Sequence, residues 1–306
     1  MTLYKRKILF WSSSALFLIC LIPLLLYSFG YRVDSGSDTW RLAQAGGLSI
    51  VPTPTTGARI FIDGVLEHET TIFSRELFLQ GLAPRKYRIR IEKEGYSTWE
   101  KALRVHPAQV ARAEVLLISK KEPQKLTRGE YTSMRFTDNN EKSLILAKPR
   151  RTFDLFSISD QTTIKLAPAN AISSATTTYT EHALDFIKSK KLTTFAYEPS
   201  RIVWWDDHSV WIKWLDGEEY LPTYIDKDEA KLITTGGAVR SVAIYPAREA
   251  VIVATDNSVE IIELDGRDKH NSFTIFSGAK PQILISKENE LLFILAEGVL
   301  YSIDLL

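Results

Sequence analysis

The sequence predicts an all-β protein that follows one N-terminal transmembrane helix: a small antiparallel β-sandwich, then a four- to five-bladed or incomplete β-propeller. Residues 8–29 contain no charged side chain. Residues 47–120 contain short alternating apolar runs that are separated by turn signals. Residues 124–306 repeat a unit of three or four apolar strands, and a period of about 40–45 residues is typical of propeller blades.

The uncharged run is long enough to cross a bilayer as a helix. At 1.5 Å per residue its length is about 33 Å, and a hydrocarbon core is about 30 Å thick. Lys5, Arg6 and Lys7 precede it, and cationic flanks stay preferentially in the cytoplasm. We therefore expect residues 1–7 to be a cytoplasmic stub, residues 8–30 a single-pass anchor in the cell membrane, and all that follows to be extracytoplasmic.

Two other roles of this segment stay open, a cleaved signal peptide and a lipoprotein signal. A signal peptide has an apolar region of about 7–15 residues and a small-residue cleavage site. This run is longer, and Tyr27-Ser28-Phe29-Gly30 matches such a site poorly. Cys20 resembles a lipid-attachment residue, but Ile19 precedes it where a small residue is needed. An uncleaved anchor is therefore the preferred interpretation.

Composition excludes several classes of site. Cys20 is the only cysteine in 306 residues, so neither an intramolecular disulfide nor a cysteine-based metal site is expected. The formal net charge is +1, whereas a nucleic-acid-binding protein usually carries a clear excess of positive charge. We expect no nucleic-acid partner, no metal and no cofactor.

The chain after the apolar run begins with a linker, expected at residues 31–46, because Asp34 to Asp38 are turn-forming residues without an apolar period. A sandwich is expected over residues 47–120, with five or six strands and no helix in the 65 or so residues from Gly57. Residues 47–51 could already form a strand. Asp63-Gly64 between apolar residues predicts a hairpin with two positive φ angles. Apolar side chains alternate with charged ones from residue 87 onwards, and the following residues are expected in the core: Tyr87, Ile89, Ile91, Trp99, Leu103 and Val105.

These residues also carry a resemblance to a known family. The motif pieces are Gly57-Ala58, Ile60-Phe61-Ile62-Asp63-Gly64, Leu82, Pro84, Tyr87 and Lys93-Glu94-Gly95-Tyr96. Together they resemble the PEGA domain over residues 47–119. Arg85 stands where that family usually has a corner glycine, and Thr70-Thr71 replaces the usual Thr-Pro. The resemblance implies a module of the kind found in surface-layer and envelope-associated proteins, and it implies no catalytic residue.

The C-terminal region is predicted from its repeats. Residues 241–265 and 282–304 match strand for strand, and Ala254 corresponds to Ala296. Looser copies occupy residues 133–158 and 201–214. The region resembles bacterial WD40-like or TolB-like propellers, without the Gly-His and Trp-Asp signatures of true WD40 repeats. Residues 124–306 hold four to five blades, so we expect an irregular or open propeller, or one completed by another chain.

Two stretches of this region break the repeat. Residues 166–182 are rich in alanine, threonine and serine and predict a long loop. Residues 183–191 are expected to form one helical turn or an outer strand.

The acidic clusters of the C-terminal region are better explained as turns than as sites. Asp206-Asp207-His208 lacks a second ligand cluster and a reason for perturbed pKa values, and aspartate is a turn residue. Asp138-Asn139-Asn140 and Asp256-Asn257-Ser258 are explained in the same way. No nucleophile elbow, P-loop, dinucleotide fingerprint or zinc-protease motif occurs. We predict no catalytic residue and a protein that is not an enzyme.

The candidate ligand-binding residues are four tryptophans: Trp204, Trp205, Trp211 and Trp214. Alternation along a strand turns at least one of them away from the blade core. Exposed aromatic side chains stack on sugars or anchor protein partners, and packing between blades is the other interpretation.

The sequence thus predicts a membrane-anchored extracytoplasmic binding or scaffold protein of a bacterial cell envelope. Residues 8–29 would contact the lipid bilayer, the PEGA-like module would space or bind wall polymer, and the propeller would bind an envelope protein or a glycan. The alternative is a surface hydrolase or lyase with its site on the propeller axis. A sensor is a weaker alternative, because seven cytoplasmic residues leave little to signal with.

Overall fold

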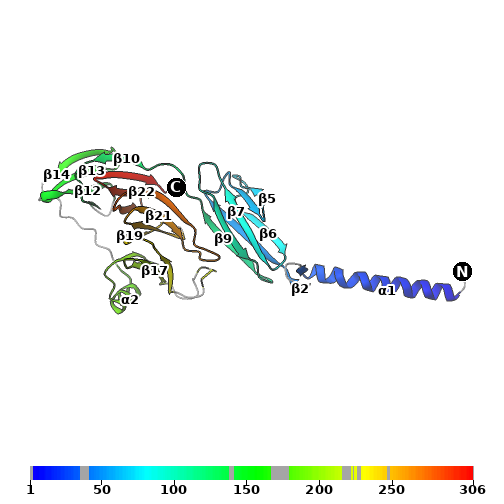
Figure 1. Ribbon diagram of the computed structural model, residues 1–306. Helices are drawn as coiled ribbons and strands as arrows, with labels where there is room; N and C mark the ends of the chain where they lie inside the picture. The colour runs from blue at the N-terminus through cyan, green and yellow to red at the C-terminus, as the bar shows by residue number, and fades with distance from the viewer. Residues whose placement is uncertain are drawn as a thin grey trace. The chain divides into compact units, whose positions relative to one another are not determined.

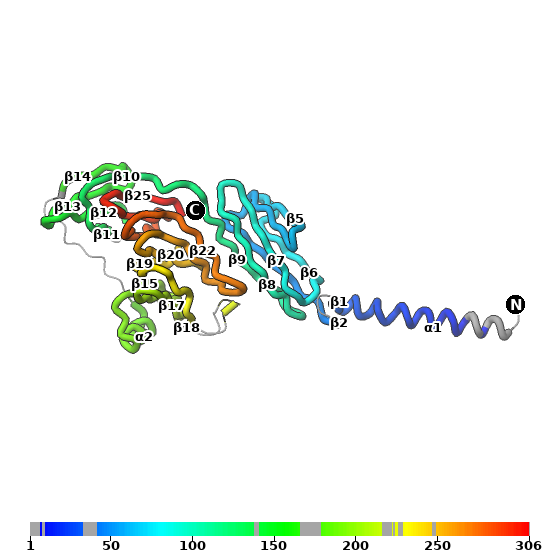
Figure 2. Tube along the Cα trace, viewed as in Figure 1, coloured from blue at the N-terminus to red at the C-terminus, as the bar shows by residue number. Residues whose placement is uncertain are grey.

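The computed structural model describes residues 3–34, 41–137, 141–166, 179–215, 222, 224–225, 229–246 and 249–305. The chain divides into two compact units, which are described separately (Figures 1 and 2). Unit 1 comprises residues 1–94 with 98–117, and unit 2 comprises residues 95–97 with 118–306.

Unit 1 begins with the helix α1, Leu3–Ser28. Its stretch Phe10–Ser28 has a mean hydropathy of 2.0 and no buried part. Pro23 lies inside the helix. By length and composition α1 could cross a membrane or serve as a signal sequence, as the sequence predicts.

The segment expected to be a linker contains a β-hairpin instead. Strands β1 (Tyr31–Asp34) and β2 (Arg41–Gln44) pair antiparallel over four residues each. Gly30 adopts a φ of +80° at the end of α1, and its carbonyl accepts a hydrogen bond of 2.7 Å from the Ala45 N–H. Strands of four residues are too short to produce a visible apolar period, so the sequence pattern missed them.

Seven further strands form the sandwich of unit 1. The first sheet has the order β6-β3-β9 and the second β5-β4-β7-β8. Their bounds are β3 Gly46–Thr53, β4 Arg59–Ile62, β5 Val65–Glu69, β6 Leu77–Leu82, β7 Lys86–Glu92, β8 Trp99–Arg104 and β9 Val110–Leu116. The six strands from β4 to β9 confirm the five or six expected after Gly57, and β3 covers the strand expected at residues 47–51. The expectation of a wholly antiparallel sandwich was wrong, because β3 and β9 run parallel.

The predicted core and hairpin of the sandwich are confirmed. Tyr87, Ile89, Ile91, Trp99, Leu103 and Val105 are all buried. Asp63 and Gly64 connect β4 to β5 with φ angles of +50° and +88°. Partial burial opposes ionisation of Asp63, but the Arg88 backbone N–H and the Arg85 guanidinium, at 2.9 and 2.7 Å, lower the pKa of this carboxyl. Arg85, which departs from the PEGA pattern, thus supports the hairpin.

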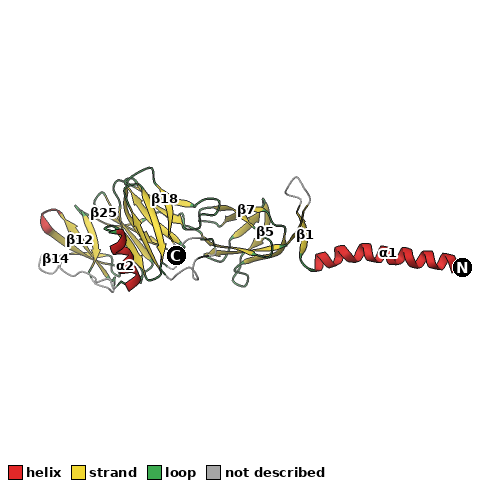
Figure 3. Cartoon of the chain, turned by 90° about the horizontal axis from the view of Figure 1, so that it is seen from below, coloured by secondary structure: helices red, strands yellow, loops and turns green. Residues whose placement is uncertain are grey.

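The described part of unit 2 contains four four-stranded antiparallel sheets. Their strands are drawn in yellow in Figure 3. Their strand orders are β11-β12-β13-β14, β15-β16-β17-β18, β19-β20-β21-β22 and β10-β25-β24-β23. The predicted repeats fall on these strands. Their bounds are β10 Gln124–Arg128, β11 Ser133–Phe136, β12 Ser143–Lys148, β13 Thr152–Ser157, β14 Thr162–Leu166, β15 Phe195–Glu198, β16 Arg201–Trp205, β17 Ser209–Trp214, β18 Glu229–Thr234, β19 Val239–Ile244, β20 Ala250–Thr255, β21 Ser258–Glu263, β22 Ser272–Ser277, β23 Gln282–Ser286, β24 Leu291–Ala296 and β25 Val299–Asp304.

The sheets neighbour one another through their first strands, but they do not form a closed ring. Strand β15 contacts β19, β19 contacts β23, and β23 contacts β11. The sheets β11–β14 and β15–β18 follow each other in the chain, yet their first strands lack the comparable contact. Strand β10, from the start of unit 2, completes the sheet formed by the last three strands.

The segment that connects β14 to β15 contains the helix α2, Glu181–Lys190. Its N-cap is Thr180, whose hydroxyl accepts a hydrogen bond from the Ala183 N–H. The structure therefore has a helix of ten residues where the sequence predicted a helical turn or an outer strand. Most of the predicted 166–182 loop, and the Asp138-Asn139-Asn140 turn, lie outside the described residues.

The turn between β24 and β25 gives a test of the β10 pairing. Gly298 has a φ of +72°, and an added Cβ would collide with the carbonyl oxygen of Gly129, which follows β10. We expect Gly298→Ala to lower the free energy of unfolding of unit 2 by about 2 kcal/mol, because both strain and collision oppose it. Denaturant unfolding of the full chain, followed by amide exchange in β25, measures this. The control is Gly236→Ala, whose Cβ would have no neighbour within 4 Å. Equal stability of the two variants would contradict the β10–β25 pairing.

Candidate binding face

The sheet β15–β18 carries a row of large side chains on one face. Phe195, Trp204, Trp211 and Lys231 are consecutive cross-strand partners on β15, β16, β17 and β18. The Trp204 and Trp211 rings are 6.1 Å apart at their centroids and inclined by only 10°. The Lys231 Nζ lies 5.6 Å from the Trp211 ring centroid. We call these four residues the aromatic row.

The other face of the same sheet is a core face. Val203, Val210, Ile212 and Trp214 form one buried cluster with residues of the sheet β19–β22, and Trp205 packs against it. Of the four predicted binding tryptophans, Trp214 is therefore buried, and Trp205 belongs to the same side. Trp204 and Trp211 alternate with these residues, so they lie on the opposite face, where both are only half-buried.

Helix α2 covers one part of the face that carries the aromatic row. Phe186 contacts Trp204 edge to face at 5.3 Å between ring centroids, and Ala183 is fully buried. The Lys190 Nζ forms an ion pair of 2.9 Å with Glu229 of β18. The Thr180 N–H, at the start of α2, donates to the Tyr197 hydroxyl of β15. The helix thus contacts side chains of β15, β16 and β18 on this face.

Lysine side chains lie beside the aromatic residues of this face, and one of them, Lys190, is paired with Glu229. Lys213 and Lys190 place their Nζ atoms 5.9 and 5.8 Å from the Phe186 ring centroid. With Lys231 over Trp211, three lysines border the aromatic side chains. Such cation–π contacts contribute about 0.5–1 kcal/mol each at exposed sites and gain strength when a partner excludes water.

Asp206, Asp207 and His208 form the turn between β16 and β17, as predicted. The Asp206 carboxylate accepts hydrogen bonds of 2.8 and 2.7 Å from the His208 and Ser209 N–H groups. These two donors lower the pKa of Asp206. Asp256-Asn257 likewise forms the turn from β20 to β21. No group of three or more metal-ligating side chains is found among the described residues.

A set of charged side chains that the sequence pattern did not reveal links three sheets. The Glu198 carboxylate binds Arg201 at 3.2 Å and Lys287 at 3.0 Å, one through each oxygen. Arg201 also contacts Glu249 at 3.4 Å, and the Tyr224 hydroxyl donates to Glu249 at 3.0 Å. Burial, and then the charge of Glu249, raise the pKa of Tyr224, so its hydroxyl stays a donor. We call these five residues the ion network.

The ion network joins hairpins of three sheets. Arg201 follows β15 at the start of β16, Glu249 precedes β20, and Lys287 follows β23, so each sheet contributes at a hairpin. Both oxygens of Glu198 bind cations.

Comparison with known proteins gives only distant likeness. No family model and no curated protein matches the chain. The solved structures that resemble it include a β-propeller domain, Cps50 (Swd1) of Myceliophteria thermophila, at 13% identity and a TM-score of 0.29, over 60% of this chain and 54% of that one. Hsv2 of Kluyveromyces lactis is 9% identical and has a TM-score of 0.28, over 76% of this chain and 70% of that one. A Bacteroides thetaiotaomicron protein of unknown function is 11% identical and has a TM-score of 0.24, over 79% of this chain and 60% of that one.

These comparisons set the limits of what is known by likeness. The chain spans about half the length of the Swd1 domain, and at such TM-scores the likeness supports no argument about function. The PEGA resemblance of the sandwich has no matching family model beside it and stays a prediction.

Proposed function

We propose that this chain is a membrane-anchored, extracytoplasmic binding scaffold of the cell envelope. In this proposal α1 is the anchor, the PEGA-like sandwich spaces the chain from the membrane or binds wall polymer, and unit 2 is an open four-bladed propeller that binds a protein partner. The observation that carries it is the aromatic row, which occupies the sheet face opposite the β19–β22 contact.

The position of the aromatic row supports a binding role. In a closed propeller each sheet packs on two neighbours. Among the described residues, the sheet β19–β22 packs on the sheet β15–β18 through the cluster that contains Val210 and Ile212, and no second sheet packs on it. Its other face keeps the half-buried indoles of Trp204 and Trp211. Tryptophan in a partly desolvated position is among the commonest energetic centres of protein interfaces.

The geometry of the indoles favours a protein partner over a glycan. A sugar ring stacks on a free aromatic face. Trp211 lies between Trp204 on one side and Lys231, its other cross-strand neighbour. Trp204 is in addition contacted by Phe186. Their exposed parts therefore suit apolar and acidic side chains of a protein, with Lys213 and Lys231 as cationic contacts.

The proposal predicts that two substitutions in the aromatic row release the partner. Native membranes solubilised in a mild detergent should hold the wild-type chain in a complex larger than the chain alone. Trp211→Ala removes the central ring and Lys231→Glu reverses the charge. We expect each to weaken the complex at least tenfold, since a central interface residue contributes about 2 kcal/mol or more. Native electrophoresis and light scattering measure the change.

The control for this experiment is Phe73→Ala, because Phe73 is 93% exposed and belongs to unit 1. It should leave the complex intact. A complex that survives Trp211→Ala and Lys231→Glu would contradict the proposed face. Saturable binding of the full-length chain to a glycan array, abolished by Trp211→Ala, would replace the protein partner by a glycan.

A further inference from the structure

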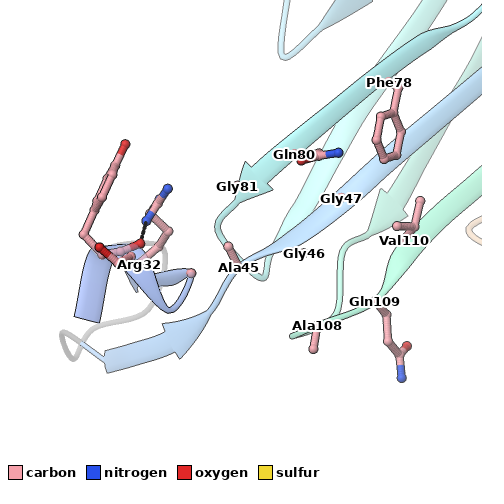
Figure 4. A pocket seen from close by; sticks show the side chains of 13 residues that line it. Arg32, Ala45, Gly46, Gly47, Phe78, Gln80, Gly81, Ala108, Gln109 and Val110 are labelled. Atoms are coloured by element: carbon pink, nitrogen blue, oxygen red, sulfur yellow. Dashed lines mark hydrogen bonds between the residues drawn. The ribbon is translucent and has the colours of Figure 1, made fainter. Parts of the chain in front are cut away.

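A pocket of about 510 Å³ opens beside the end of α1, within unit 1 (Figure 4). Gly46 and Gly47 of β3 and Gly81 of β6 line it without side chains, so the backbone is accessible there. A Cβ on Gly47 would lie 3.1 Å from the Leu79 carbonyl oxygen, so the strands leave no room for one. The pocket is therefore shaped by the absence of side chains.

Arg32 is the charged group of this pocket. Its Nη1 donates to the Tyr27 and Tyr31 carbonyl oxygens at 3.2 and 3.0 Å, and its guanidinium carbon lies 3.9 Å from the Tyr27 ring centroid. Its Nε and Nη2 have no hydrogen-bond partner within the part of the chain that the structure describes. A Cβ on Gly81 would lie 3.4 Å from Nη2, so these two donors are next to the glycine wall.

The chemistry of the lining selects an anion. Among the described residues that line the pocket, Arg32 is the only charged one and none is a carboxylate. The Nε and Nη2 donors of a guanidinium form a fork that matches two oxygens of a phosphate. Phe78 and Val110 border the pocket and are 47% and 52% exposed. A phosphate group fits the end of the pocket at which Arg32 lies.

The place of the pocket along the chain selects the source of that phosphate. The apolar stretch of α1 ends at Ser28, and the Arg32 guanidinium is bonded back to the carbonyl of Tyr27. In a membrane the polar headgroup layer extends about 5–7 Å beyond each side of the hydrocarbon core. The guanidinium is therefore held at the depth of the lipid phosphates. Tyr27 and Tyr31 are the aromatic residues expected at such an interface.

We propose that this pocket binds the phosphate of an anionic phospholipid, with Arg32 as the phosphate-binding residue. The inference deepens the proposed anchoring and rests on it. In this inference the apolar span of α1 holds the chain in the membrane, and the junction between α1 and the sandwich adds a preference for anionic lipids.

The test uses the full-length chain in vesicles of phosphatidylcholine mixed with phosphatidylglycerol. Native mass spectrometry of protein released in a mild detergent gives the ratio of phosphatidylglycerol-bound to phosphatidylcholine-bound protein. We expect Arg32→Gln to lower this ratio about fivefold, the effect of one cation near an anionic surface. Arg32→Lys, which keeps the charge, should lower it less. Arg75→Gln, at an exposed arginine of the same unit, should leave it unchanged.

The outcomes separate this inference from the proposed function. Wild-type protein that fails to float with vesicles would contradict the anchoring itself and the inference with it. Protein that floats normally but shows the same lipid ratio in the wild type and in Arg32→Gln would overturn the pocket alone. An equal loss in Arg32→Gln and Arg75→Gln would also overturn it, because the preference would then come from net charge.

Discussion

Replacing Trp99 with alanine is expected to lower the free energy of unfolding of the sandwich by about 3–5 kcal/mol. Trp99 is only 1% exposed and is one of the largest fully buried side chains. It begins β8 and pairs with Ile91 of β7, whose side chain is also fully buried. Its loss leaves a cavity that neighbouring strands cannot fill without breaking their ladder, so both transfer and cavity terms oppose folding.

Hydrogen exchange of the full-length chain measures this effect in each unit separately. Amides of β7 and β8 should lose protection in Trp99→Ala, while amides of β20 and β24 should keep theirs, because the two units have separate cores. Phe73→Ala, at the 93% exposed residue of the same unit, is the matched control and should change stability by less than about 0.5 kcal/mol. Equal loss of protection in both units would contradict the division of the chain.

Replacing Arg201 with methionine should destabilise unit 2 by about 3 kcal/mol. The Arg201 side chain is 7% exposed and binds Glu198 and Glu249. Methionine keeps most of the volume but leaves two partly buried carboxylates without their shared cation. Removing one member of a buried ion pair costs about 3–5 kcal/mol in fully buried cases, and the partial exposure of Glu249 places this one at the lower end.

The contrast with an exposed ion pair makes this prediction specific. Arg240 binds Asp256 at 2.7 Å, but both side chains are more than a third exposed. Arg240→Met should therefore change the free energy of unfolding by about 1 kcal/mol or less. Denaturant titration of unit 2 compares the two variants. If Arg201→Met were as stable as Arg240→Met, the ion network would not hold the three sheets together.

Local patterns in the sequence predicted most of the strands correctly. The Asp63-Gly64 hairpin and the buried face of β7 follow from neighbouring residues alone. The strands around Ala254 and Ala296 were found because each hairpin repeats the same short pattern. The length and hydropathy of α1 were equally visible, whereas the orientation of this helix stays a prediction.

Pairings between distant segments were missed for a physical reason. The parallel contact of β3 with β9 and the contact of β10 with β25 join strands that are far apart in the chain. No local period encodes which distant edge a strand will meet. The β1–β2 hairpin was missed because its strands are short, and it replaced the linker that the turn-rich composition had suggested.

The candidate site was predicted only in part. Alternation indicated that some tryptophans leave the core, and the structure shows that Trp204 and Trp211 lie opposite the face of Trp205 and Trp214. The sequence could not reveal that α2 covers Trp204, because Phe186 is distant from it in the chain. The ion network was hidden for the same reason, since single charged residues at hairpins look like ordinary surface.

The measurement that tests the central claim most directly is the side of the membrane on which each end of α1 lies. Cys20 is the only cysteine, so Cys20→Ser gives a cysteine-free background. In it, Ser189→Cys places an exposed thiol on α2 and Lys7→Cys places one before the apolar span. In intact cells, stripped of any outer barrier, an impermeant maleimide should label Ser189→Cys at once and Lys7→Cys only after lysis. The reverse pattern, or labelling of neither residue before lysis, would contradict a membrane-anchored extracytoplasmic scaffold.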